Sequence, residues 1–154
     1  DTLKITLKQG WNLISVNLMP EQSRNVIYYV STLFAGLDVI KIKTMSSFWH
    51  AGQPDVFNSL TSITPGEGYL VKMNTADTLT VTGTPYLRGF ENLGGLPAGW
   101  SLMGCPYQTA TPFSTYFNTT NCVLVKNFDG FWIPNGTTNS IQNIEPGKGY
   151  FLKK

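Results

Sequence analysis

Apolar and polar residues alternate along much of the chain, and this period of two is typical of β-strands. Between residues 3 and 8, leucine and isoleucine alternate with lysine and threonine, as in a strand with one buried face. Lys41 and Lys43 share one face of another predicted strand, which by default is its solvent side. Further strands are predicted where apolar runs follow turn residues, over 11–16, 39–43, 69–73 and 79–82.

A shorter stretch has the spacing of a helix. Apolar residues recur three and four positions apart between residues 26 and 34, with Ser23 as a cap and Gly36 as a stop, so a helix is predicted over 24–34. Residues 112–118 predict a weaker helix of about two turns. The pattern therefore predicts a strand-rich α+β fold with antiparallel hairpins.

Three blocks of sequence occur twice in the same order. Residues 10–14 return as 99–103, residues 40–49 as 123–132, and residues 58–69 as 139–150. We therefore predict two copies, about 1–84 and 86–154, with a boundary near 86–96 and one short helix in each copy. Because each copy is too small to bury a large core alone, the copies are expected to share one core as a pseudo-twofold pair. Two independent units in tandem are the alternative.

Composition narrows the class of protein. The 154 residues are 42% apolar and 13% aromatic, which is too much for a disordered chain. A net charge of +2 gives no basic footprint for nucleic acid, and no apolar run is long enough to predict membrane insertion. Low charge with abundant Thr, Asn, Ser and Gly is common in bacterial extracellular modules. The start at Asp1 indicates a mature protein or a segment of a longer one, so other domains of a longer chain are expected partners.

Two motifs carry a resemblance to a known kind of module. The chain reads Gly-Trp-Asn-Leu-Ile-Ser at residues 10–15 and Pro-Gly-Glu-Gly-Tyr at residues 65–69, and both motifs return in altered form in the second copy. This arrangement resembles duplicated repeat modules of bacterial secreted or cell-surface multidomain proteins. The resemblance implies an extracellular accessory module with no assigned catalytic residues.

The tryptophans are the candidate ligand residues. Exposed aromatic rings can stack on the apolar faces of sugars. Trp11 and Trp100 lie within apolar strands and are expected in the core. Trp49 and Trp132 lie near hairpins and are the better candidates for an open ring, with neighbouring polar groups for sugar hydroxyls; the alternative is that they too are core residues. The predicted carbohydrate site therefore consists of Trp49, Trp132, His50 and Asn135.

The two cysteines occupy positions that are valine in the other copy. Cys105 takes the place of Val16, and Cys122 takes the place of Val39. If these positions touch, an oxidising compartment would produce a disulfide. We therefore predict a Cys105–Cys122 disulfide, with two separate buried thiols as the alternative.

Nothing in the sequence assembles a catalytic set. Glu67 lies in a turn between glycines, but its counterpart is Lys148, so the position is interpreted as a solvated turn tip. No metal-ligand spacing and no cofactor motif are found. The expected function is that of a non-catalytic extracellular binding or adhesion module, most consistent with carbohydrate, and not an enzyme. The alternative is a structural spacer or protein-assembly domain of a larger surface protein.

Overall fold

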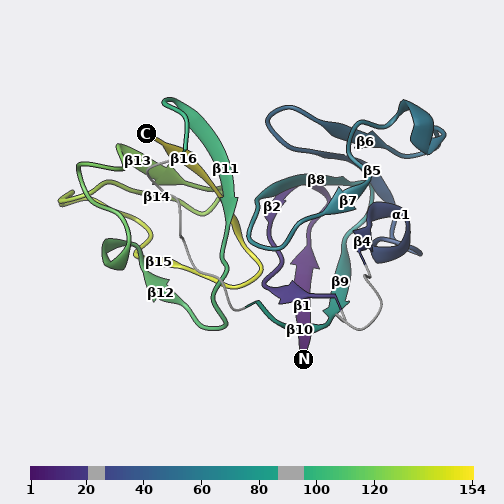
Figure 1. Cartoon of the computed structure of the whole chain (residues 1–154), viewed down its shortest axis with the longest axis horizontal. Coiled ribbons are helices and arrows are strands. Elements are labelled where there is room, and N and C mark those ends of the chain that lie inside the picture. Colours follow the sequence, from purple (N-terminus) through teal and green to yellow (C-terminus); the bar gives the residue numbers. More distant parts are fainter. Residues whose placement is uncertain (21–26, 87–95) are drawn as a thin grey trace.

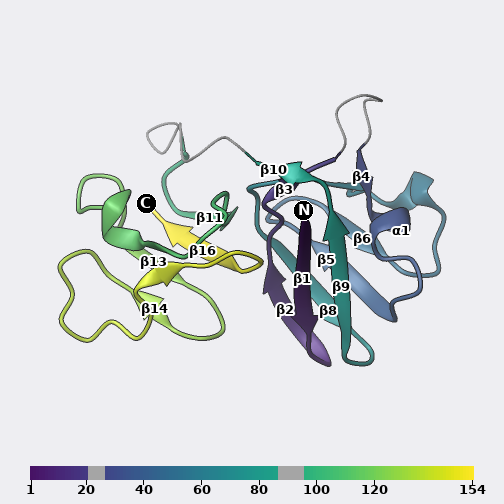
Figure 2. The ribbon, with the colours of Figure 1, turned by 90° about the horizontal axis from the view of Figure 1, so that it is seen from below.

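The computed structural model describes residues 1–20, 27–86 and 96–154. Within these ranges the chain is strand-rich, has few helical residues, and pairs its strands in antiparallel fashion, as the sequence predicts. Strands β1 to β10 form a first half and strands β11 to β16 a second half, and the two halves lie side by side along the long axis (Figures 1 and 2).

A four-stranded sheet forms the centre of the first half. Its strands are paired in the order β2, β8, β5, β6. Every strand is short, and the chain enters β8 through the turn at Pro65 and Gly66, where glycine adopts a φ of 85°. The bounds of the four strands are Gly10–Ile14, Tyr69–Met73, Val39–Lys43 and Phe48–His50.

Three further strand pairs complete the first half. The longest joins β1 to β9 and carries buried Ile5, Leu7, Leu79 and Val81, which explains the alternation at the start of the sequence. The other two pairs join β3 to β10 and β4 to β7. The bounds are Thr2–Leu7 for β1, Asp77–Thr82 for β9, Leu18–Met19 for β3, Thr84–Pro85 for β10, Tyr28–Tyr29 for β4 and Ser62–Ile63 for β7.

The second half is built around another four-stranded sheet, paired in the order β11, β16, β13, β14. Counted along the chain, the strands of either sheet stand in the order first, fourth, second, third. A short pair of β12 with β15 lies beside the second sheet, as β4 with β7 lies beside the first. The bounds are Trp100–Gly104 for β11, Gly149–Lys153 for β16, Leu124–Lys126 for β13, Phe131–Trp132 for β14, Thr111–Pro112 for β12 and Asn143–Ile144 for β15.

Helical structure is shorter than predicted. The α-helix α1 covers Val30–Leu33, the end of the predicted span 24–34; Ser23 and the predicted helix start lie outside the described residues. Residues 112–118 contain a 3-10 turn, η4 (Phe113–Thr115), where a two-turn α-helix was expected. Pro112 and the β12–β15 pair explain this, because the chain is extended up to the turn. Another 3-10 turn, η2, covers Asp55–Phe57.

The buried apolar residues in the described part of the chain form two clusters, and the expected single core is not found. One cluster is made by the first half, where Tyr69, Ile42 and Leu7 are its large, fully buried members. The other is made by the second half around Phe113 and Tyr150. The predicted boundary between the copies, 86–96, falls largely on residues outside the description.

Backbone hydrogen bonds join the two halves. The Ser15 N–H donates to the Gly147 carbonyl at 3.1 Å, and the Gly104 N–H donates to the Gly66 carbonyl at 2.9 Å. Under the sequence match between copies, Ser15 corresponds to Gly104 and Gly147 to Gly66, so the two bonds are reciprocal. The Ser15 hydroxyl adds two more bonds across the same boundary: it donates to the Lys148 carbonyl at 2.5 Å and accepts the Cys105 N–H at 3.0 Å.

Glycines allow this close approach. A Cβ on Gly68 would lie 2.6 Å from the Met103 carbonyl oxygen, and a Cβ on Gly149 would lie 2.7 Å from that of Ile14. Each of these glycines belongs to the Pro-Gly-x-Gly-Tyr turn of one half and packs on the strand end of the other half. The turns are therefore contact elements between the halves, in addition to shaping each sheet.

The predicted disulfide is wrong. Cys105 and Cys122 are both buried, free thiols in the second cluster. Cys105 follows β11 and Cys122 precedes β13, and β16 lies between these strands in the sheet. Two strands with a third strand between them are about 9–10 Å apart, which exceeds the Cα separation of about 7 Å that a disulfide tolerates. Burial raises the pKa of each thiol to about 11.

Candidate functional site

The outer face of the first sheet carries an exposed tryptophan. Trp11 is 39% exposed, whereas the sequence predicts it in the core. The reason is its neighbour Asn12, which points inward and is 8% exposed. The Asn12 side chain accepts the Lys8 N–H and donates to the Lys8 carbonyl, both at 2.8 Å, so a polar residue occupies the buried face without an unpaired group.

The second sheet repeats this exposed position. Trp100, which corresponds to Trp11, is 37% exposed, and its expected burial is likewise wrong. It packs edge-on against Phe151 with ring centres 6.3 Å apart. Each sheet thus presents one indole ring on its outer face, at the edge strand nearest to the other half.

Two lysines flank each exposed indole. Lys43 and Lys72 place their Nζ atoms 5.3 Å and 5.8 Å from the centre of the Trp11 ring. Lys126 and Lys153 lie 4.8 Å and 5.8 Å from the centre of the Trp100 ring. The sequence match pairs Lys43 with Lys126 and Lys72 with Lys153. These distances are those of cation–π interactions, so the same aromatic and cationic arrangement occurs twice.

Each arrangement is completed by the hairpin turn of the opposite half. Phe128, in the turn between β13 and β14, lines a groove of about 290 Å³ together with Trp11. Met45, in the turn between β5 and β6, lines a pocket of about 270 Å³ together with Trp100, Lys126 and Phe151. Figure 1 shows the loop between β5 and β6 reaching toward β11.

We call these two arrangements the aromatic sites. The first aromatic site consists of Trp11, Lys43, Lys72 and Phe128, and the second aromatic site of Trp100, Lys126, Lys153 and Met45. Met45 and Phe128 are 56% and 60% exposed, so both present apolar surface to solvent beside the indole rings.

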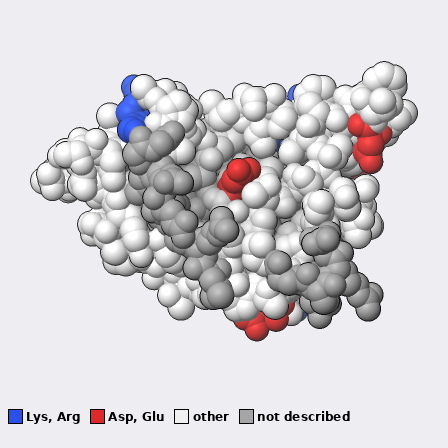
Figure 3. All heavy atoms as spheres, in the orientation of Figure 1, with Lys and Arg blue, Asp and Glu red and all other residues white. Residues whose placement is uncertain are grey.

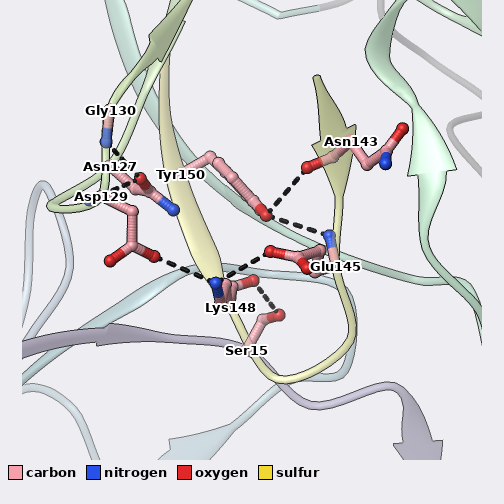
Figure 4. A network of polar contacts seen from close by, with 8 residues as sticks. All are labelled: Ser15, Asn127, Asp129, Gly130, Asn143, Glu145, Lys148 and Tyr150. Atoms are coloured by element: carbon pink, nitrogen blue, oxygen red, sulfur yellow. Dashed lines mark hydrogen bonds and ion pairs between the residues drawn. The ribbon is translucent and has the colours of Figure 1, made fainter. Parts of the chain in front are cut away.

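A polar network supports the wall of the first aromatic site. Lys148 makes ion pairs with Asp129 at 3.0 Å and with Glu145 at 2.8 Å (Figure 4). The hydrogen bond to Glu145 raises the pKa of Lys148. Lys148 is thus not a free turn tip, because it ties the β13–β14 turn to the turn before β16. In the second site its counterpart Glu67 lines a groove of about 450 Å³ with Met45 and Trp100.

A buried tyrosine holds each Pro-Gly-x-Gly-Tyr turn. The Tyr150 hydroxyl accepts the Glu145 N–H at 2.9 Å and donates to the Asn143 carbonyl at 3.4 Å (Figure 4). Burial raises the pKa of the Tyr150 phenol, so the hydroxyl keeps the proton that it donates. In the first half the Tyr69 hydroxyl accepts the Thr64 N–H at 2.7 Å.

The tryptophans predicted as open rings lie on the inner faces of the sheets. Trp132 is 5% exposed, is paired with buried Val125 and packs against Phe113 with ring centres 5.5 Å apart, so it offers no open face to a sugar. Trp49 is paired with buried Ile42 and packs against the first cluster while staying partly exposed. Residues directly paired across antiparallel strands project to the same face, which places both rings inward.

The two predicted polar partners lie in different halves. His50 is on edge strand β6, where its N–H donates to Asn58 Oδ1 at 3.0 Å. Its side chain lies on the outer face, because His50 is paired with Lys41, which is paired in turn with Lys72. Asn135 is exposed in the loop after β14 with a φ of 60°, a left-handed conformation that suits a turn.

Charged side chains are sparse over the face of the molecule shown in Figure 3, where they form isolated groups. The lysines of the outer sheet faces, in contrast, lie in pairs beside the exposed indole rings. In the described part of the chain, Lys41, Lys43, Lys72, Lys126 and Lys153 have no carboxylate within salt-bridge distance.

No family, curated protein or solved structure matches this chain.

Two further observations concern the described residues. No group of three or more His, Cys, Asp or Glu side chains lies close enough there to hold a metal ion. Nor does any helix in these ranges have the length and apolar character needed to span a membrane. The indoles and lysines of the two outer sheet faces are the candidate binding groups.

Proposed function

We propose that the chain is a non-catalytic binding or adhesion module of an extracellular or cell-surface protein and that its ligand is carbohydrate. The observation that carries this proposal is the exposed indole on the outer face of each sheet, flanked by two lysines. An exposed indole loses little entropy on binding and covers the apolar face of a sugar ring, while the ammonium groups donate hydrogen bonds to its oxygens. The ligand residues are therefore Trp11 and Trp100 rather than Trp49 and Trp132.

The proposed module consists of two related copies. We take residues 1–84 and 86–154 to be two copies related by a pseudo-twofold axis, as in the bacterial repeat modules that the sequence resembles. The common order of strand pairing supports this, and so do the reciprocal bonds of Ser15 to Gly147 and of Gly104 to Gly66. In this arrangement each aromatic site takes its indole from one copy and its apolar turn residue from the other.

A glycan array tests the proposed function. Wild-type protein, Trp11→Ala, Trp100→Ala and the double variant are compared with Phe57→Ala, which removes a 66% exposed ring outside both aromatic sites. We expect carbohydrate binding by the wild type and Phe57→Ala, weaker binding by each tryptophan variant, and loss in the double variant. Loss of a stacked ring is expected to cost about 1–3 kcal/mol, as it does for bases stacked on aromatics. Absence of wild-type binding to any glycan, or full binding by the double variant, contradicts the proposal.

A second function is favoured by a different surface. Val56 and Phe57 in η2 are neighbours in the sequence and are 83% and 66% exposed. Exposed apolar residues that lie together are typical of protein contact surfaces. A structural spacer or protein-assembly domain would use this surface and not the indoles. In that case Phe57→Ala, and not the tryptophan variants, would weaken association with neighbouring domains in pull-down with the parent protein.

A further inference from the structure

A row of polar and aromatic side chains crosses the outer face of the first sheet. Trp11 is paired with Lys72, Lys72 with Lys41, and Lys41 with His50, so these four residues form one line across β2, β8, β5 and β6. Three interstrand spacings give the line a length of about 14 Å. This exceeds the contact that a single sugar ring makes and fits a short oligosaccharide.

A second line of side chains runs beside the first. Lys43 is paired with Phe48 and with Leu70 on the same outer face. The Lys41 Nζ lies 5.7 Å from the centre of the Phe48 ring, so aromatic and cationic groups also lie together at this edge of the face. The surface offers three ammonium groups, two aromatic rings and one imidazole.

The lysines of this face have aromatic rings as neighbours. Lys41 and Lys72 are paired on adjacent strands, and their ammonium groups lie near different rings, that of Lys72 near Trp11 and that of Lys41 near Phe48. Among the described residues, no acidic side chain forms an ion pair with either of them. An anion bound over these strands would give both ammonium groups a partner of opposite charge.

We infer that the ligand is an anionic carbohydrate, bearing carboxylate or sulfate groups, and that it binds mainly along the outer face of the first sheet. This inference rests on the proposed carbohydrate function and adds the charge of the ligand. Sugar rings stack on Trp11 and Phe48, and Lys41, Lys43 and Lys72 contact the anionic groups. The ammonium groups make charge-assisted hydrogen bonds, which are stronger than those to neutral hydroxyls.

The second sheet is less suited to the same ligand. Leu124 stands where the first sheet has Lys41, and Ile133 where it has His50. Its outer face therefore keeps only the two lysines that flank Trp100. The two halves are consequently unequal, with the stronger anionic site in the first half.

The test compares ligands that differ only in charge. Isothermal titration calorimetry measures the affinity of the full chain for two pairs of ligands. The first pair is oligogalacturonate and the same oligosaccharide with its carboxyl groups reduced to alcohols, and the second pair is dextran sulfate and dextran. We expect each anionic member to bind at least tenfold more tightly than its neutral partner, and added salt to weaken only the anionic binding.

Variants separate specific recognition from charge alone. Lys43→Gln with Lys72→Gln is expected to weaken anionic binding by about fivefold to twentyfold, since each exposed pair contributes up to about fivefold. Lys4→Gln removes one positive charge, half of what the double variant removes, from an exposed position on β1 and is expected to change affinity less than twofold. Trp11→Ala is expected to weaken binding of both members of a ligand pair.

Each outcome decides between the two claims. Equal affinity for charged and neutral partners overturns the anionic inference and leaves the carbohydrate function standing. No binding to any of the four carbohydrates overturns the anionic inference, and the glycan array then decides whether the carbohydrate function stands. Anionic binding that Trp11→Ala leaves intact, or equal binding of single-stranded DNA, shows attraction to polyanions in general and overturns the inference.

Discussion

Ser15 of the first half and Gly104 of the second half face each other, and exchanging these two residues tests the pseudo-twofold arrangement. A Cβ on Gly104 would lie 2.2 Å from the Ser15 Cβ, so only one of these two equivalent positions can carry a side chain. The variant Ser15→Gly with Gly104→Ser moves that side chain to the other half. If the halves are related by a twofold axis, the new serine should donate to the Glu67 carbonyl and accept the Val16 N–H, the counterparts of Lys148 and Cys105.

The single variants should both be destabilised. Ser15 is fully buried, and Ser15→Gly leaves the Cys105 N–H without a partner, which costs about 1–3 kcal/mol, with about 0.5–1 kcal/mol more for glycine flexibility. Gly104→Ser forces its side chain against Ser15 and the Glu67 carbonyl, and such overpacking costs about 1–3 kcal/mol. Independent effects would add to about 2.5–7 kcal/mol, whereas we expect the exchange variant within about 1 kcal/mol of wild type.

Urea unfolding at constant m-value measures these differences, and each kcal/mol corresponds to about 2–4 °C in Tm for a chain of this size. The control is Ser15→Gly with Gly104→Ala, which relieves the crowding without restoring a hydroxyl. It should be about 1–3 kcal/mol less stable than the exchange variant. Equal stability of the two double variants, or additive losses in the exchange variant, would refute the twofold relation.

Further predictions concern the core and the thiols. Trp132→Ala should cost about 3–5 kcal/mol of unfolding free energy because the ring is buried against Phe113, whereas Trp11→Ala should cost no more than about 1 kcal/mol; the reverse order in urea unfolding would contradict the assigned faces. Two thiols should react with Ellman's reagent after unfolding without reductant, and reaction in the folded protein at pH 8 should be slow; fewer than two thiols would indicate a disulfide. Because burial raises both thiol pKa values from 9.0 to about 11, the thiols' contribution to stability is complete below about pH 9 and is lost as the pH rises through about 11. In urea unfolding, the variant Cys105→Val with Cys122→Val should therefore lose less stability than the wild type between pH 9 and pH 11. An identical loss in both proteins would show that thiol ionisation is not the cause.

The period-two pattern was sufficient to predict a strand-rich fold with antiparallel sheets. Turn chemistry placed the hairpins well, as at Asp129 and Gly130, because these residues favour turns whatever surrounds them. The order of the strands in each sheet and the contacts between the halves could not be predicted from the sequence pattern. The separation of Cys105 from Cys122 depends on β16, which lies at the far end of the chain and enters the sheet between their strands.

The expected burial of Trp11 was wrong because Asn12, the next residue along the strand, takes the buried face. Trp11 was expected in the core because it lies in an apolar strand, yet Asn12 is buried because its side chain satisfies the backbone of Lys8, and Trp11 therefore projects outward. A signal for the correct face was present in the lysines. Lys43 and Lys72 alternate with buried Ile42 and Val71, so they mark the outer face that Trp11 shares. Using that signal requires the pairing register, which only the fold supplies.

The most direct measurement of the central claim follows the indole Nε1–H signals of the four tryptophans in two-dimensional NMR while oligogalacturonate is added. Each signal is assigned by a single Trp→Phe variant. The account predicts that the Trp11 signal shifts first, that the Trp100 signal shifts at higher ligand concentration, and that the Trp132 signal stays in place. Shifts confined to Trp49 and Trp132, or no shift at Trp11 at saturating ligand, would contradict it.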